Sequence, residues 1–266
     1  MIRIDTRGVF VHATLDAPAT HNALTDEMVA GLADALAHAE SQPEVRGIVL
    51  RGAGGTFCAG GDFTRFKALM ASPAPAPEPD PIARFSRAFG ALLERWRDSD
   101  IATLAVVEGA AMGGGCGLAA CCDIVLAATT AQFAMPEVTL GLPPAQIAPF
   151  VADRLGRAAA LHLMLTGRRL TGEQAQAIGL VDEVLWPEAV QARLEIWLAD
   201  LARAEPAALR ATKAILRHDR STSRGAALDF AAEAFAGALR SGQAVEGLLA
   251  LTQKRPARWV PRGGER

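Results

Sequence analysis

The stretch IATLAVVEGAAMGGG, residues 101–115, carries the clearest structural signal in the chain. Residues 101–107 are almost all apolar, which is typical of a strand buried on both faces of a parallel sheet. Residues 108–115 then contain four glycines. Glycine lets a ligand approach the main chain closely and adopts backbone conformations that other residues avoid. The stretch therefore predicts a buried strand followed by a turn that contacts a ligand.

The same succession of strand and glycine-rich turn occurs earlier in the chain. Residues 45–50 (VRGIVL) predict a buried strand, and a glycine-rich turn follows at residues 52–62; residues 123–127 (DIVLA) predict the next strand. Strands that alternate with helices predict right-handed crossovers and a mostly parallel sheet, and therefore an α/β protein. Because parallel sheets bind ligands at the carboxyl ends of their strands, we expect both turns at one ligand-binding edge.

The flanking regions differ in pattern. Residues 2–15 predict a hairpin-like pair of strands, and Thr25 is expected to cap a helix that covers the sheet. Beyond about residue 154 the sequence is rich in alanine and reads as a series of amphipathic helices. We therefore divide the chain into a core of residues 1–195 and a helical C-terminal region of residues 196–266.

Residues 72–81 (SPAPAPEPDP) place proline at every second position. This spacing excludes a helix or a sheet strand and predicts an extended segment. We favour a surface linker over the alternative, a flap above a binding site.

Composition and charge exclude several classes of protein. The chain has 266 residues with 27 Lys and Arg against 29 Asp and Glu, so its formal net charge is −2. Electrostatic binding of nucleic acid needs an excess of cations, which this balance does not offer. The hydrophobic share of 50% excludes global disorder. We expect neither a membrane span nor a secretory leader, because no apolar run reaches about 18 residues and the start lacks a signal pattern.

Common catalytic and metal-binding motifs are absent from the sequence. It contains no Gly-x-Ser-x-Gly, no His-Glu-x-x-His and no P-loop. The four cysteines lack the spacing of zinc ligands and are expected to be reduced core residues of a cytoplasmic protein. Residues 115–120 fit a relaxed dinucleotide-binding fingerprint. That fingerprint also requires an acidic residue at the end of the next strand, whereas the candidate here, Glu137, lies beyond a loop. A Rossmann dehydrogenase is therefore disfavoured.

A different interpretation uses both glycine-rich turns at once. Main-chain N–H groups at a strand-to-helix turn are free donors, and two of them can hold a carbonyl oxygen whose charge grows during a reaction. A single acid placed opposite, such as Glu137, can then move a proton at a neighbouring carbon. This combination indicates enolate chemistry.

The sequence resembles the enoyl-CoA hydratase/isomerase (crotonase) superfamily from about residue 2 to Trp259. The motifs that carry the resemblance are His21–Leu24, Thr56–Phe63, Glu108–Gly115, Cys122–Ile124, Phe133–Glu137, Leu165–Gly167 and Ala175–Val181. The resemblance implies a crotonase-like core of stacked β-β-α turns with a C-terminal helical trimerisation region. It also implies an acyl-CoA thioester substrate, no metal or redox cofactor, and a homotrimer or dimer of trimers.

The resemblance assigns roles by position. The N–H groups of Ala59 and Gly114 would form an oxyanion hole, and Glu137 would transfer protons. The residues expected to border coenzyme A are Ala23, Leu24, Gly60, Gly61, Asp62, Phe63 and Lys254. Lys254 would reach the CoA phosphates, in some members from a neighbouring subunit, although a solvated terminal lysine fits equally. By its own context, Asp62 is expected mainly to cap a helix.

Gly117 departs from the family pattern. In hydratases that use two glutamates, the first matches Gly117 and the second matches Glu137. Glycine cannot transfer a proton, so Glu137 acts alone or another group assists it. Residues 140–150 (LGLPPAQIAPF) look like the branch that hydrates methylglutaconyl-CoA and isohexenylglutaconyl-CoA, and a second enzyme carboxylate would repel such carboxylated substrates. Gln146 in this segment either positions water or a substrate carboxylate or has a structural role.

We therefore expect a hydratase-like lyase that adds water to a 2-enoyl-CoA thioester through a stabilised enolate. The resemblance of residues 140–150 to that branch implies a branched or carboxylated acyl group. A Δ3,Δ2-enoyl-CoA isomerase is an open alternative, because it needs one base and no water. Another class also stays open, a non-catalytic family member that binds a CoA ester or RNA, although the charge balance argues against RNA.

Overall fold

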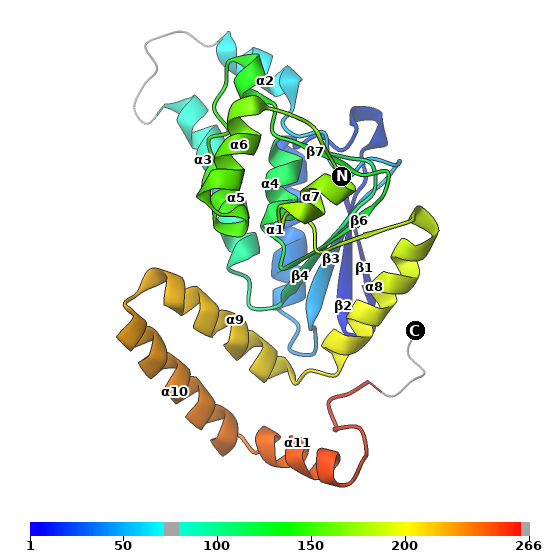
Figure 1. Ribbon diagram of the computed structural model, residues 1–266, viewed down its shortest axis with the longest axis vertical. Coiled ribbons are helices and arrows are strands. Elements are labelled where there is room, and N and C mark those ends of the chain that lie inside the picture. The colour runs from blue at the N-terminus through cyan, green and yellow to red at the C-terminus, as the bar shows by residue number, and fades with distance from the viewer. Residues whose placement is uncertain (72–79, 262–266) are drawn as a thin grey trace.

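The computed structural model describes residues 1–71 and 80–261 (Figure 1). The strands are β1 (Ile2–Arg7), β2 (Phe10–Leu15), β3 (Gly47–Gly52), β4 (Ala102–Val107), β5 (Ala110–Met112), β6 (Ile124–Ala128), β7 (Gln132–Ala134), β8 (Leu170–Thr171) and β9 (Glu183–Leu185). The α-helices are α1 (Asp26–Glu40), α2 (Phe63–Met70), α3 (Pro81–Arg97), α4 (Gly114–Ala120), α5 (Ala148–Leu155), α6 (Arg157–Thr166), α7 (Gly172–Ala177), α8 (Pro187–Ala202), α9 (Pro206–Ser221), α10 (Arg224–Arg240) and α11 (Gln243–Thr252). Two 3-10 helices are η1 (Pro18–Thr20) and η2 (Glu137–Leu140).

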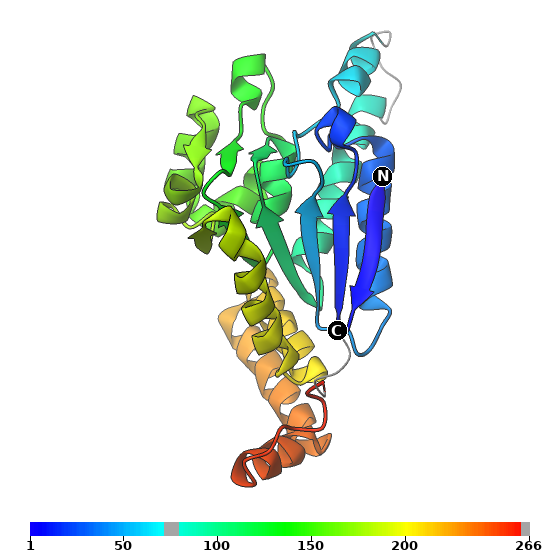
Figure 2. The same cartoon turned by 90° about the vertical axis from the view of Figure 1, so that its right-hand side faces the viewer.

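The main sheet has the strand order β1-β2-β3-β4-β6-β9. In this sheet β1 and β2 pair antiparallel. The other neighbours, from β2 through β3, β4 and β6 to β9, pair parallel, as the aligned arrows in Figure 2 show. The predicted hairpin at residues 2–15 and the predicted mostly parallel sheet are confirmed. The glycine-rich turns follow β3 and β4 at the carboxyl ends of neighbouring strands, as expected.

A smaller sheet of β5, β7 and β8 lies beyond these ends. Strand β5 directly follows β4, and β7 directly follows β6, so these two turns of the chain each contribute one strand to each sheet. The first glycine-rich turn joins this second layer through a parallel bridge between Cys58 and Ala111. This arrangement is the stacked β-β-α core that the resemblance implied.

Side chains alternate between the two faces of the main sheet. Ile48 and Leu50 of β3 are buried in the core cluster that contains Met28 of α1. Val49 points the other way, into a separate cluster with Val190 and Leu194 of α8. The sheet therefore separates a large core, which supports the glycine-rich turns, from a smaller core beneath α8.

Two helix caps follow the sequence signals. Thr25 accepts a hydrogen bond from the N–H of Met28 at 3.1 Å and caps α1, as predicted. Asp62 accepts one from the N–H of Thr64 at 2.8 Å and caps α2, which confirms its expected structural role.

Most of the proline-rich stretch 72–81 lies outside the described residues. The described residues resume at Asp80, which accepts a hydrogen bond from the N–H of Ile82 at 2.8 Å and caps α3. Pro81 is the first residue of that helix, where its missing N–H removes no helical hydrogen bond. The choice between linker and flap stays a prediction.

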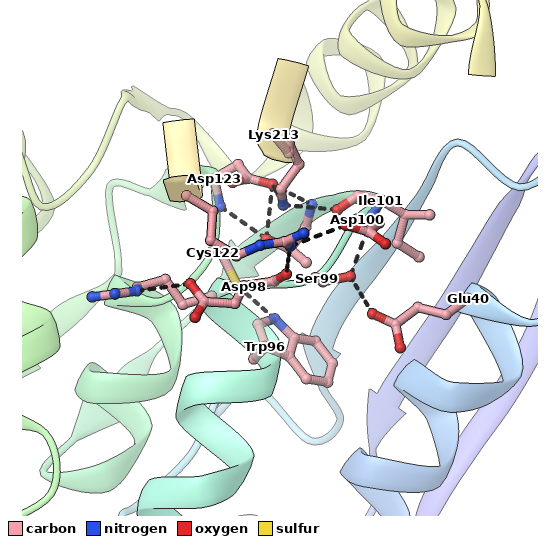
Figure 3. Close-up of polar contacts among 12 residues, drawn as sticks. Glu40, Trp96, Asp98, Ser99, Asp100, Ile101, Cys122, Asp123 and Lys213 are labelled. Atoms are coloured by element: carbon pink, nitrogen blue, oxygen red, sulfur yellow. Dashed lines mark hydrogen bonds and ion pairs between the residues drawn. The ribbon is translucent and has the colours of Figure 1, made fainter. Parts of the chain in front are cut away.

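Helices α9, α10 and α11 extend away from the sheets as a C-terminal arm (Figure 1). Lys213 of α9 fastens the arm to the core, because its ammonium group contacts Asp123 at 2.5 Å and donates to the carbonyl of Ile101 at 2.8 Å (Figure 3). The division predicted at residue 195 falls inside α8, which packs on the sheet. No helix among the described residues is long and apolar enough to cross a bilayer.

Candidate active site

The two glycine-rich turns lie side by side. The N–H of Cys58 donates to the carbonyl of Ala110 at 3.0 Å, and the N–H of Met112 donates to the carbonyl of Cys58 at 2.9 Å. A Cβ atom on Gly60 would lie 2.7 Å from the Met112 carbonyl oxygen and 3.5 Å from the nitrogen of Gly114. Gly60 also has a φ of +91°, so glycine is required on both counts.

Gly114 is the first residue of α4, where helix geometry leaves the N–H without an intrahelical acceptor. Within residues 1–71 and 80–261 this N–H has no hydrogen-bond acceptor. The positive end of the helix dipole adds to its attraction for negative charge. Gly114 therefore fits its predicted role as an oxyanion donor.

Ala59 differs from the prediction in one respect. Its N–H already donates to the carbonyl of His21 at 3.0 Å. The expected role as a second donor to a thioester oxygen therefore requires that this oxygen share the Ala59 N–H with His21 or replace it.

Asn22 holds this arrangement in place. His21 and Asn22 have φ angles of 52° and 59°, in the left-handed region that costs energy for residues with a side chain. The fully buried amide of Asn22 donates to the carbonyls of Ala53 at 2.9 Å and Thr56 at 2.7 Å. Sequence analysis gave Asn22 no role; the tolerance of asparagine for left-handed backbone was the available signal.

Glu137 begins η2, directly after β7 and Pro136. A Cβ atom on Gly113 would lie 2.8 Å from Oε1 of Glu137. Oε2 is buried and has no hydrogen-bond partner among the described residues. Burial raises the pKa of the Glu137 carboxyl above its ordinary value, against an opposing backbone hydrogen bond. A carboxyl group with a raised pKa therefore lies beside Gly113, the residue before Gly114, whose N–H has no acceptor among the described residues.

The side chain of Ile147 occupies the place of the missing carboxylate. A Cβ atom on Gly117 would lie 2.7 Å from Cβ of Ile147 and still closer to its Cγ2. Ile147 is buried in the core, with 3% of its surface exposed. Position 117 therefore has no room for a side chain while Ile147 stays where it is.

Three of the residues predicted to border coenzyme A lie near the N–H of Gly114, namely Leu24, Gly60 and Gly61. The N–H of Leu24 donates to the carbonyl of Gly60 at 2.8 Å, and Leu24 forms a parallel bridge with Gly61. Cδ1 of Leu24 would lie 2.7 Å from a Cβ atom on Gly114. Ala23 precedes Leu24 and is partly exposed.

Of the remaining predicted CoA residues, Asp62 and Phe63 directly follow Gly61 at the start of α2, whereas Lys254 lies elsewhere. Phe63 begins α2 with 58% of its surface exposed and packs edge-to-face against Phe66 at 6.1 Å between ring centroids. Asp62 caps α2. Lys254 follows α11, and Figure 1 places that end of the arm at the opposite end of the molecule from α2. The structure therefore does not bring Lys254 to the candidate site of its own chain.

Helix α3 adds residues that sequence analysis did not assign to the site. Phe89 would lie 3.2 Å from a Cβ atom on Gly114 and so forms an apolar wall beside the oxyanion donor.

Gln146 rests against Gly90 of α3, with Cδ 2.9 Å from a Cβ atom at that position, and its amide donates to Oγ of Ser86 at 3.3 Å. These contacts support the structural role that was one of the two predictions for Gln146.

Comparisons with known proteins agree with this arrangement. The family model described as enoyl-CoA hydratase/isomerase matches residues 6–262. The chain is 31% identical to the 2,3-dehydroadipyl-CoA hydratase of Escherichia coli strain K12, over 91% of each protein. Two similar solved structures are an enoyl-CoA hydratase/isomerase from Marinobacter aquaeolei, at 38% identity, and Pseudomonas aeruginosa AtuE, at 41%. Both have a TM-score of 0.93 and cover 98% of this chain and 99% of their own.

These matches span both sheets, the two glycine-rich turns, Glu137 and the C-terminal arm. The agreement in sequence extends over nearly the whole length of each protein, and the agreement in fold extends equally far. The chain therefore belongs to the enoyl-CoA hydratase/isomerase family.

Proposed function

We propose that the chain is a hydratase-like lyase that adds water to a 2-enoyl-CoA thioester. The thioester oxygen accepts from the N–H groups of Gly114 and Ala59, replacing the His21 carbonyl at Ala59. Glu137 removes a proton from water as the hydroxide bonds to Cβ, and the electron pair of the double bond moves onto the thioester oxygen. Glu137 then returns the proton to Cα, so the reaction needs no metal or redox cofactor.

The observation that carries this proposal is the Glu137 carboxyl beside Gly113, whose buried Oε2 has no hydrogen-bond partner among the described residues, together with the N–H of the next residue, Gly114, which has no acceptor among them either. A turnover screen in ¹⁸O-labelled water, with crotonyl-CoA and branched and carboxylated enoyl-CoA esters, tests it. Label at Cβ of the product supports hydration. Tight, salt-sensitive RNA binding without turnover of any ester would support the non-catalytic alternative instead.

An isomerase is the second candidate, because Glu137 supplies a carboxylate beside Gly113 and Ile147 lies where a second carboxylate would stand. A Δ3,Δ2-enoyl-CoA isomerase moves a proton between two carbons of its substrate and incorporates no oxygen from water. A shifted double bond without ¹⁸O in the product would therefore favour isomerisation over hydration.

We propose that the acyl group is branched or carboxylated. The reason is electrostatic: where Ile147 replaces a second carboxylate, a negative charge on the substrate meets less repulsion. The Escherichia coli relative named as a 2,3-dehydroadipyl-CoA hydratase is consistent with such a group. The same screen distinguishes this class, since carboxylated esters are expected to show a higher kcat/KM than crotonyl-CoA.

Introducing the missing glutamate, Gly117→Glu, is expected to destabilise the protein by roughly 1–3 kcal/mol through overpacking against Ile147. Combining it with Ile147→Ala relieves this clash. The double variant should therefore lose less stability than the sum of the two single variants, measured by urea unfolding. Strictly additive losses would contradict the contact between position 117 and Ile147.

The pH dependence of kcat/KM is expected to report on Glu137. As the base, this carboxyl acts when ionised, so activity should fall as the pH drops through its pKa. Because burial raises that pKa, the acidic limb should lie above the range of an exposed glutamate. The limb should persist in Glu188→Gln, a change at an exposed position of α8, and disappear from the residual activity of Glu137→Gln.

We also propose that the protein assembles as a homotrimer or a dimer of trimers through the arm. Large apolar side chains of α10 and α11 are exposed in the single chain, including Phe235 at 67%, Leu248 at 64% and Leu251 at 75%. Such a surface is typical of a subunit interface. Light scattering in solution measures the assembly.

We also propose a cytoplasmic location for the protein, because its four buried, free cysteines suit a reducing compartment.

A further inference from the structure

A cavity of about 260 Å³ opens on the face of the main sheet that α8 partly covers. Its lining includes Val49, which belongs to the small core beneath α8, and Gln191 of α8 itself. Arg3, Arg7 and Arg51 also line it, against Glu108 as the acidic lining residue. The cavity is therefore mainly cationic, and it is separate from the residues that surround Glu137 and Gly114.

Strand register explains why the arginines gather there. Arg3 of β1 lies opposite Thr14 of β2, which lies opposite Arg51 of β3. Arg7 is four residues along β1 from Arg3, and His12 of β2 is two residues from Thr14. Because side chains alternate with a period of two, these groups all project from one face.

Arg51 is the least satisfied of these cations. Its Nε is buried and has no hydrogen-bond partner among the described residues. Arg7 and Arg3 have acidic neighbours, Asp5 at 2.7 Å and Asp16 at 3.7 Å, whereas no such contact within 4 Å is found for Arg51 in the described part of the chain. Desolvation lowers the pKa of the Arg51 guanidinium, with Glu108 opposing the change. A partly buried guanidinium with an unpartnered Nε and no close anion carries a desolvation cost, and an added anion would relieve that cost.

The charges of the cavity also act on the imidazole of His12. Burial lowers its pKa to about 4, and the charges of Arg7 and Arg51 act in the same direction while Asp5 opposes them. The imidazole is therefore neutral near pH 7, with one ring N–H to donate. The cavity offers an anion two kinds of donor, guanidinium groups and a neutral imidazole.

We propose that this cavity is a binding site for a small oxyanion of the phosphate type, held by Arg51 with help from Arg7 and His12. The planar guanidinium matches phosphate oxygens in pairs, which suits this class of ligand. The lining of the cavity includes Ala53 and Glu108, which belong to the two glycine-rich turns. A bound anion would therefore lie behind the segments that form the candidate active site.

Titration of the full-length protein with inorganic phosphate tests the proposal, with sodium chloride at matched ionic strength as the reference. We expect saturable binding by calorimetry and a rise in the thermal unfolding midpoint with phosphate but not with chloride. Arg51→Met should weaken phosphate binding by about tenfold or more, the usual effect of losing a charged hydrogen bond. Arg157→Gln, at an exposed position of α6, should leave it unchanged.

Two further measurements guard against a folding defect in the Arg51 variant. Arg7→Gln changes an exposed member of the cavity and should also weaken phosphate binding. The His12 resonance, identified by its loss in His12→Gln, should titrate at a higher pH when phosphate is added, because a bound anion offsets the nearby arginines. Equal effects of phosphate and chloride, or phosphate binding unchanged in both arginine variants, would overturn the proposal.

Discussion

Glu137→Gln is expected to reduce turnover of the best enoyl-CoA ester by about 10²–10⁴, the usual range for loss of a general acid or base. The amide keeps the shape of the side chain beside Gly113 but cannot take a proton from water. Binding of the CoA ester should survive, because no predicted CoA contact changes. Steady-state kinetics and calorimetric titration with the saturated acyl-CoA separate these two effects.

The stability of the same variant provides an internal control. A carboxyl whose pKa is raised by folding stabilises the protein below its unfolded pKa, and this contribution is lost as the pH rises through the folded pKa. At pH 7 the buried charge of Glu137 therefore opposes folding, so Glu137→Gln should unfold at the same or a higher temperature. Full activity in a well-folded variant would remove Glu137 from the mechanism.

Gly114→Pro is expected to lower kcat/KM by at least about 10²–10³, the range reported for loss of one oxyanion donor. Proline lacks the N–H, and its ring would also stand where the thioester oxygen accepts that bond. The helix tolerates proline at its first position, and Gly113, with a ψ of −118°, lies outside the α region that a following proline disfavours. The effect should therefore fall on the reaction more than on folding.

Gly114→Ala is the matched control for this variant. Alanine adds the same Cβ atom, which meets Cδ1 of Leu24 at 2.7 Å and the ring of Phe89 at 3.2 Å, but it keeps the N–H. These neighbours are ends of side chains that can shift, so the alanine variant should retain much more activity than the proline variant. If the two variants lost activity equally, crowding would explain the effect and Gly114 would not be an oxyanion donor.

Much of the fold follows from signals that are local in the sequence. The apolar runs that became β3, β4 and β6 and the caps Thr25 and Asp62 depend on residues within a few positions of one another. The site was predictable to the same extent, since Glu137 and the glycine-rich turns lie in the motifs that carry the family resemblance. The structure adds that these turns touch, through Cys58 and Ala111.

What the amino-acid order determined by itself is the succession of strands and turns, the family, and the presence of one candidate acid with glycine at position 117. Only the tertiary structure decided that Ile147 fills the space beside Gly117, that His21 accepts the hydrogen bond from Ala59, and that α11, which Lys254 follows, lies at the opposite end of the molecule from α2. The physical reason is distance along the chain. Periodicity and capping act between near neighbours, whereas packing and main-chain hydrogen bonds between remote loops depend on how all the elements close around one core.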